Sequence, residues 1–173
     1  MNIRKSEEKD IPAILDIFVQ ARVYMKSHGN PTQWEEGYPS ETIVKNDIES
    51  GNSYVCVADG EVVGTFTLII GEDPTYKVIR HGAWHSDKLY GTIHRIASAN
   101  KVRGLAQICF DFCADQIDYL RIDTHENNKS MQAAIKKYGF EYCGVIDTRD
   151  GTERLAFDYI KNYWHEKVNN LLN

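Results

Sequence analysis

The residues best suited to chemistry lie where an expected strand gives way to a helix, at Lys101-Val102-Arg103-Gly104-Leu105-Ala106. A helix N-terminus presents unpaired N–H groups and the positive end of the helix dipole. Gly104 and Ala106 keep the surface low enough for a phosphate to reach those groups, and Lys101 and Arg103 add positive charge. The segment is neither a Walker loop nor a dinucleotide G-x-G-x-x-G loop. It predicts an anion site, with a plain loop before a helix as the alternative.

The elements that must position this turn follow from hydrophobic periodicity and from turn residues. Asp10 and Ser40 are expected to cap two helices, and Asp59-Gly60 predicts a hairpin turn. The expected order is a strand at 2–5, helices from 11 to before Gly29 and from 41 to Gly51, strands at 53–58 and 61–70, a loop at 72–88, a strand at 90–99, a helix at 104–116, a strand at 119–124, a helix ending at Gly139, and strands at 140–146 and 155–160.

This order predicts an α/β fold with a mixed sheet. The strands at 90–99 and 119–124 enclose a helix, so they should be parallel with a right-handed crossover. A chain of 173 residues is most simply one domain. We expect that domain to span residues 1–160, with residues 161–173 as a C-terminal helical extension of it. The amphipathic pattern of that extension could serve a homodimer.

Charge and hydropathy exclude several classes of protein. Lys and Arg total 20 against 25 for Asp and Glu, which gives a net charge of −5 and no basic stripe for nucleic acid. No apolar run approaches the length of a bilayer span, so no membrane partner is expected. The first ten residues, MNIRKSEEKD, lack the apolar core of a secretory signal. A cytoplasmic location is therefore predicted.

The four cysteines predict buried, reduced thiols rather than a disulfide framework or a metal centre. Their spacing contains no C-x-x-C pair, and the pair His81 and His85 is interrupted by a glycine, so no metal is expected. A nucleophilic Cys143 working with a nearby histidine would make a different enzyme, but no local signature supports it.

Two motifs together carry a family resemblance over residues 2–160. Lys101-x-x-Gly104-x-Ala106 resembles the Q/R-x-x-G-x-G/A signature of the GCN5-related N-acetyltransferase (GNAT) family, which likewise follows a strand and opens a helix. Asn128, followed at the family's spacing by Gly139-Phe140, resembles the family's second motif. The order of elements agrees as well.

The resemblance implies a GNAT-like sheet, mostly antiparallel and splayed between two central parallel strands, with flanking helices. It implies acetyl-CoA as co-substrate, with Asn128 contacting it across the splay. The pyrophosphate would sit on backbone N–H groups of Val102, Arg103, Gly104, Leu105, Ala106 and Gln107. The pantetheine arm would pair with the backbone of His94, Arg95 and Ile96, and an N–H near His94 would steady the developing oxyanion.

The chain departs from the family pattern in two places. The signature opens with Lys101, which lacks the planar fork of arginine. The helical tyrosine that often protonates the leaving thiolate in the family is replaced by Ile135, which has no proton to give. Tyr138 lies one turn further on, where a core or rim aromatic is the simpler expectation.

Within the fold that the resemblance implies, candidate residues can be named for proton transfer and for acceptor binding. Asp123 is the first choice for the general base and His94 the second, since an unperturbed histidine already titrates near neutral pH. The acceptor, a small-molecule or peptide amine, would meet Trp34, Tyr38, Trp84 and His125. We expect direct transfer of an acetyl group to a primary amine. A non-catalytic acyl-CoA sensor of the same fold is the alternative, and the missing tyrosine favours it.

Overall fold

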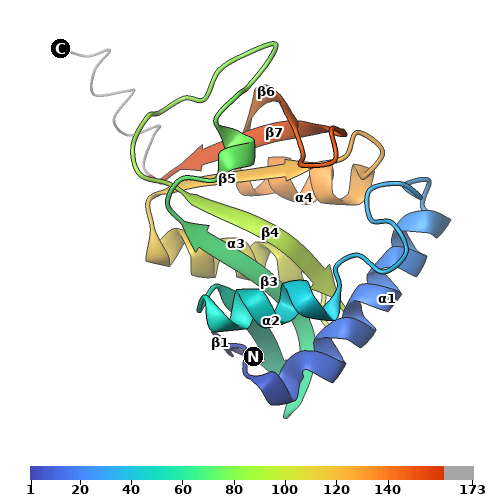
Figure 1. The fold of residues 1–173 in the computed structure, drawn as a ribbon. Coiled ribbons are helices and arrows are strands. Elements are labelled where there is room, and N and C mark those ends of the chain that lie inside the picture. The colour runs from blue at the N-terminus through green and yellow to red at the C-terminus, as the bar shows by residue number, and fades with distance from the viewer. Residues whose placement is uncertain (162–173) are drawn as a thin grey trace.

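The computed structural model describes residues 1–161, and Figure 1 shows their arrangement. The described elements are β1 (Asn2–Lys5), η1 (Glu8–Asp10), α1 (Ile11–Ser27), α2 (Glu41–Glu49), β2 (Ser53–Ala58), β3 (Glu61–Ile70), η2 (Pro74–Tyr76), β4 (Gly91–Ser98), α3 (Leu105–Gln116), β5 (Tyr119–Thr124), α4 (Lys129–Tyr138), β6 (Glu141–Asp147) and β7 (Glu153–Ile160). No helix among them is both long and apolar enough to cross a membrane.

The strands form one mixed sheet in the order β1-β2-β3-β4-β5-β7-β6. β4 and β5 run parallel, and every other neighbouring pair is antiparallel. The predicted β-α-β unit and the fold class are therefore confirmed. The short turn η2, inside a segment expected to be loop, was not predicted.

Local sequence explains where the helices begin and end. The Ser40 hydroxyl accepts a hydrogen bond from the Ile43 N–H at the start of α2, and the Asn128 side chain caps α4 in the same way. Gly139 ends α4 in the left-handed conformation, with φ of 110°. The expected C-terminal helical extension lies, apart from Lys161, outside the described residues.

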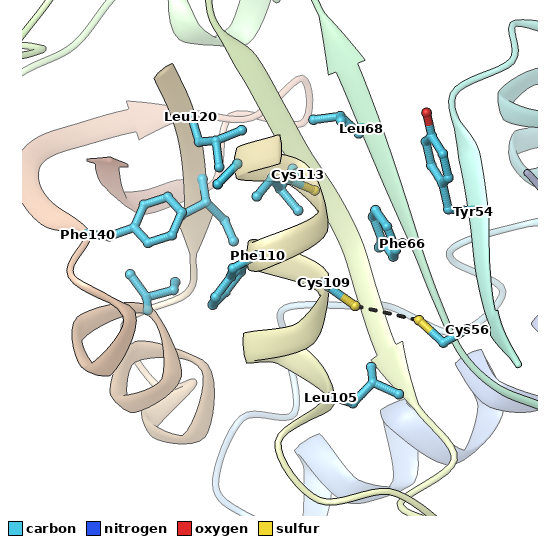
Figure 2. Packing of buried hydrophobic residues seen from close by; sticks show 14 of the residues in the cluster. Tyr54, Cys56, Phe66, Leu68, Leu105, Cys109, Phe110, Cys113, Leu120 and Phe140 are labelled. Carbon is cyan, nitrogen blue, oxygen red and sulfur yellow. Dashed lines mark hydrogen bonds between the residues drawn. The ribbon is translucent and has the colours of Figure 1, made fainter. Parts of the chain in front are cut away.

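Alternating side chains divide the core between the two faces of the sheet. On one face, α3 and α4 cover the larger cluster, in which Phe110 of α3 and Phe140 after α4 are buried together with Phe66 of β3 (Figure 2). On the other face, α1 and α2 pack on Val55 and Ala97. Beside these helices, the segment 71–90 lays Tyr76 and Tyr90 over Tyr119 of β5. The sheet is therefore buried on both faces around β4 and β5.

A substitution at Phe110 tests the packing of the larger cluster. Its side chain is fully buried, and its ring lies 5.2 Å from that of Tyr138 and 5.1 Å from that of Phe140. Phe110→Ala should lower the free energy of unfolding by about 3–5 kcal/mol in urea denaturation, because it leaves a cavity among these rings. Val23→Ala, at a position 65% exposed on α1, should change it by less than about 0.5 kcal/mol. A loss below about 1 kcal/mol for Phe110→Ala would contradict this packing.

Candidate functional site

A cavity of about 1000 Å³ runs from the open ends of β4 and β5 to the turn before α3. Its walls also include residues of α1 and α2, the loop around Trp34, the start of α4 and the turn at 148–150. Most of the residues singled out from the sequence line it: Trp34, Tyr38, His94, Arg95, Ile96, Val102, Gly104, Leu105, Ala106, Asp123 and Asn128.

The cavity exists because β4 and β5 pair along only part of their length. Their parallel register ends at Ile93 opposite Ile122, whereas β4 continues to Ser98. From His94 onward, the edge of β4 that faces β5 has no strand partner among residues 1–161. The splay expected between these strands is therefore present.

A bulge on β4 accompanies the splay. Arg95 and Ile96 together face Phe66 of β3, and Arg95 has a positive φ of 54°, which is strained for a residue with a side chain. The Arg95 guanidinium holds this conformation through two hydrogen bonds, of 3.0 and 2.8 Å, to the Asp47 carboxylate of α2. The contact with Asp47 therefore stabilises the strained backbone conformation of Arg95.

The turn before α3 presents a row of free backbone donors. Within residues 1–161, no group accepts a hydrogen bond from the N–H of any residue from 102 to 106. Gly104 has a φ of 73°, and no atom would lie within 4 Å of an added Cβ, so the surface above the turn is open. Successive free N–H groups at a helix start suit an anion.

Three residues of the segment 101–107 lie outside the cavity lining, namely Lys101, Arg103 and Gln107. Lys101 forms an ion pair with Glu61, and the Gln107 side chain donates to the Ala134 carbonyl over 2.8 Å. The Gln107 N–H already donates to the Gly104 carbonyl, so it is not among the free donors. Arg103 does not line the cavity either.

Asn128 lies at the cavity and at the start of α4. Its Oδ1 accepts from the Met131 N–H at 3.1 Å, and its Nδ2 donates to Gln33 Oε1 at 2.9 Å. The residue therefore caps the helix and fixes the loop that carries Trp34. Its second amide hydrogen remains for a ligand.

Asp123 and Tyr76 meet at the end of β5. The Tyr76 hydroxyl donates to Asp123 Oδ1 at 2.5 Å, and Arg154 Nε lies 4.0 Å from Asp123 Oδ2. Burial raises the pKa of Tyr76 well above its ordinary value, and the Asp123 charge adds to the effect. Tyr76 therefore stays protonated and acts as a donor to the carboxylate.

His94 is paired with a carboxylate from the segment between β3 and β4. Its Nε2 lies 2.8 Å from Asp73 Oδ2, and both residues line the cavity. Burial alone would raise the pKa of Asp73, but hydrogen bonds from His94 and Thr75 outweigh it and hold that pKa well below its usual range. Asp73 is therefore ionised at neutral pH.

Of the four candidates for acceptor binding, two line the cavity and two do not. Trp34 lines the cavity in edge contact with Phe18 and Tyr38, and Tyr38 also lines it. Trp84 lies outside the lining, stacked on Tyr76 with its Nε1 donating to the Tyr76 carbonyl at 3.0 Å. His125 is also outside, and its Nδ1 accepts from the Asn127 N–H in a local turn.

The position of the family's tyrosine provides no proton donor. Ile135 is fully buried in the larger cluster. Tyr138 packs with Phe110, Phe140 and Tyr159, away from the cavity. Tyr138 is therefore a half-buried aromatic at the rim of the larger cluster.

The four cysteines are free and buried, and none of them lines the cavity. His85, Cys143 and Asp158 form one cluster of metal-ligand type within the described residues. Its atoms are engaged in hydrogen bonds: Asp158 accepts from the His85 ring and N–H and from the Tyr119 hydroxyl. Burial raises the pKa of the Cys143 thiol, which keeps it protonated rather than nucleophilic.

Sequence reasoning missed Asp73, Tyr76 and Arg154. Asp73 precedes Pro74, and its side chain caps the turn η2, a local signal that could have been read. Nothing in the spacing indicated that this turn lies against His94 and Asp123, because that contact depends on how the segment 71–90 crosses the sheet.

Comparison with known proteins gives matches among solved structures. No family model matches the chain, and no curated protein does. A ribosomal-protein-alanine N-acetyltransferase from Brucella melitensis shares the fold, with 20% identity, a TM-score of 0.61 and coverage of 92% of this chain and 99% of that one. A putative acetyltransferase from Salmonella typhimurium, solved with its cofactor acetyl-CoA, is 13% identical with a TM-score of 0.64, over 92% of this chain and 93% of that one.

A nearer match comes from Streptococcus agalactiae. Its GNAT-family acetyltransferase has a TM-score of 0.84 and 34% identity, and the alignment covers 92% of this chain and 95% of that one. Identity at this level over nearly the whole of both chains, together with the splayed sheet, means that this chain belongs to the GNAT family of acetyltransferases.

Proposed function

We propose that this protein transfers an acetyl group from acetyl-CoA directly to a primary amine. The observation that carries the proposal is that one cavity joins the unpartnered edge of β4 to the free N–H groups of residues 102–106. Those two features fit the two ends of one long ligand. The Salmonella typhimurium relative, solved with acetyl-CoA, supports this choice of ligand.

The chain's own groups would hold the ligand at both ends. The N–H groups of residues 102–106 would donate to the pyrophosphate at the positive end of the α3 dipole. The open edge of β4 at residues 94–96 would pair with the amides of the pantetheine arm, as an added strand would. Asn128 would donate its free amide hydrogen from across the splay.

Acetyl-CoA would supply an acetyl thioester at the opening between β4 and β5. The overall change turns an ammonium ion and a thioester into an amide, a thiol and one proton. A C–N bond forms, the C–S bond breaks, one proton of the ammonium goes to the thiolate, and another goes to a base. Asp123 and His94 are the titratable side chains proposed for that base.

Direct transfer, without a covalent enzyme intermediate, is favoured by the position of the thiols. None of the four described cysteines lines the cavity, and burial raises the pKa of Cys143. Trp34 and Tyr38 would contact the acceptor at the wall formed by the loop between α1 and α2.

The experiment that tests this function measures thiol release from acetyl-CoA with a panel of primary amines, together with the mass of the products. Amine-dependent thiol release and a product heavier by one acetyl group would support it. Tight binding of acetyl-CoA with no amine-dependent release across the panel would instead favour the sensing module, which the absence of a tyrosine at position 135 also favours.

The anion site can be tested with an isosteric pair at Gly104. Asp and Asn both tolerate the left-handed conformation, and no atom lies within 4 Å of the new Cβ, so both variants should fold. Gly104→Asp should weaken acetyl-CoA binding by more than about ten-fold relative to Gly104→Asn, because it adds a negative charge beside the pyrophosphate. Calorimetry measures both affinities, and equal values would put the anion elsewhere.

Asn128 can be tested with its cap preserved. Serine caps helices as well as asparagine does, so Asn128→Ser should keep the stability of α4 but lose the amide donor. The apparent acetyl-CoA constant should rise about five-fold, the effect of one neutral hydrogen bond. Gln33→Ala removes the loop acceptor that Asn128 shares with Asn30, leaves the Asn128 amide in place and serves as the control. If it raises the constant equally, the effect of Asn128 passes through the loop.

The base can be tested by comparing His94→Ala with Asp123→Asn on a confirmed amine substrate. Removing the base should lower turnover by roughly 10²–10⁴-fold and abolish the acid limb of the pH–rate profile. His28→Ala, an exposed position outside the cavity lining, is the control. If both test variants keep the turnover and acid limb of the unmodified protein, neither residue is the base, and the amine loses its proton to solvent before it binds.

A further inference from the structure

We propose that Asp73 is a positioning residue, which holds the His94 imidazole with its proton on Nε2 so that Nδ1 accepts the proton of the acceptor amine. The proposal rests on the proposed function and chooses between the two candidate bases. It involves a residue from the segment between β3 and β4 that the sequence motifs do not include.

Asp73 is itself fixed by several contacts. Its Oδ1 accepts from the Thr75 N–H at 2.9 Å and from the Thr75 hydroxyl at 2.7 Å. Its own N–H donates to the Tyr90 hydroxyl at 3.0 Å. The residue is 8% exposed, and Pro74 follows it, so its backbone has little freedom. These contacts leave Oδ2 aimed at His94.

The pairing decides the tautomer of His94. An ionised carboxylate can only accept hydrogen bonds, so the 2.8 Å contact between Asp73 Oδ2 and His94 Nε2 requires a hydrogen on Nε2. In the neutral ring Nδ1 then carries the lone pair. No group among the described residues forms a hydrogen bond with Nδ1. A histidine held in this way presents one proton acceptor at the cavity.

The groups around His94 leave Nδ1 for this role. Tyr76 meets the imidazole edge-on, with ring centroids 5.8 Å apart, and its hydroxyl is turned to Asp123. Asp123 in turn already accepts from Tyr76 and lies near Arg154. Each carboxylate oxygen of Asp123 therefore faces a protein donor or cation, whereas no group among the described residues forms a hydrogen bond with His94 Nδ1.

The proton balance is simple. As the C–N bond forms and the C–S bond breaks, the ammonium loses two protons. His94 Nδ1 takes one of them and becomes an imidazolium, which Asp73 stabilises through Nε2–H, and the other goes to the leaving thiolate of CoA. After the amide leaves, the imidazolium returns that proton to solvent. Asp73 neither gains nor loses a proton.

Asp73→Asn tests the assignment with nearly unchanged shape. Because the Thr75 N–H needs an acceptor, the asparagine oxygen should stay at Thr75 and its NH₂ group should face His94. That amide donates, so His94 Nε2 must accept, and the ring proton moves to Nδ1. Turnover should then fall roughly 10²–10⁴-fold, as in His94→Ala, while the KM for acetyl-CoA stays unchanged.

The decisive readout needs no activity. Long-range ¹H–¹⁵N spectra of the intact protein report which ring nitrogen of His94 carries hydrogen, with the assignment taken from His94→Ala. We expect hydrogen on Nε2 in the unmodified protein and on Nδ1 in Asp73→Asn. Asp147→Asn, which removes an exposed carboxylate paired with Arg80, is the control and should change neither tautomer nor turnover.

The possible outcomes distinguish a failure of this proposal from a failure of the proposed acetyltransferase function on which it rests. Hydrogen on Nδ1 in the unmodified protein overturns the proposal, even if the protein is an acetyltransferase. Full turnover in Asp73→Asn with the tautomer exchanged overturns it as well. If no amine is acetylated but His94 carries its hydrogen on Nε2, the proposed function fails while the pairing stands. If Asp73→Asn does not fold, the tautomer of His94 in the unmodified protein tests the proposal on its own.

Discussion

The early end of pairing between β4 and β5 is the constraint on which the site depends. Two parallel strands that paired along their full length would satisfy each other's backbone groups and leave no space between them. Here the register between the two strands ends at Ile93 and Ile122, and β4 has a bulge at Arg95 directly after that point. The Arg95–Asp47 contact supports that strained residue from α2, so a helix on the sheet face helps to keep the site open.

The segment 71–90 packs on the sheet and also places the side chains of Asp73 and Tyr76 at the opening between β4 and β5. It is anchored along its length, at Asp73 by His94, at Arg80 by backbone hydrogen bonds to Val145, and at His85 by Asp158. Two carboxylates thus lie at one cavity with different partners, Asp73 with an imidazole and Asp123 with a phenol. The same types of group acquire different roles because their neighbours differ.

Most of the fold could be predicted from the sequence, because periodicity and caps are local. Ser40, Asp59-Gly60 and Gly139 mark boundaries that the structure has at the same places. The turn at Gly104 was also recognisable, since free N–H groups at a helix start are a local property. Asp73 was not, because its partner lies 21 residues away and the path of the intervening segment is set by packing on Tyr119 and Ile146. Lys101 shows the converse: its charge suggested an anion ligand, but it pairs with Glu61 on the neighbouring strand.

The central claim is that one ligand spans the free N–H groups before α3 and the open edge of β4. A titration of the ¹⁵N-labelled protein with acetyl-CoA, followed by backbone amide chemical shifts, tests it most directly. The account predicts the largest shifts at residues 102–106 and 94–96 together, with saturation at one common affinity, and little change in β6. Shifts confined to another surface, or absent from both segments at saturating acetyl-CoA, would contradict it.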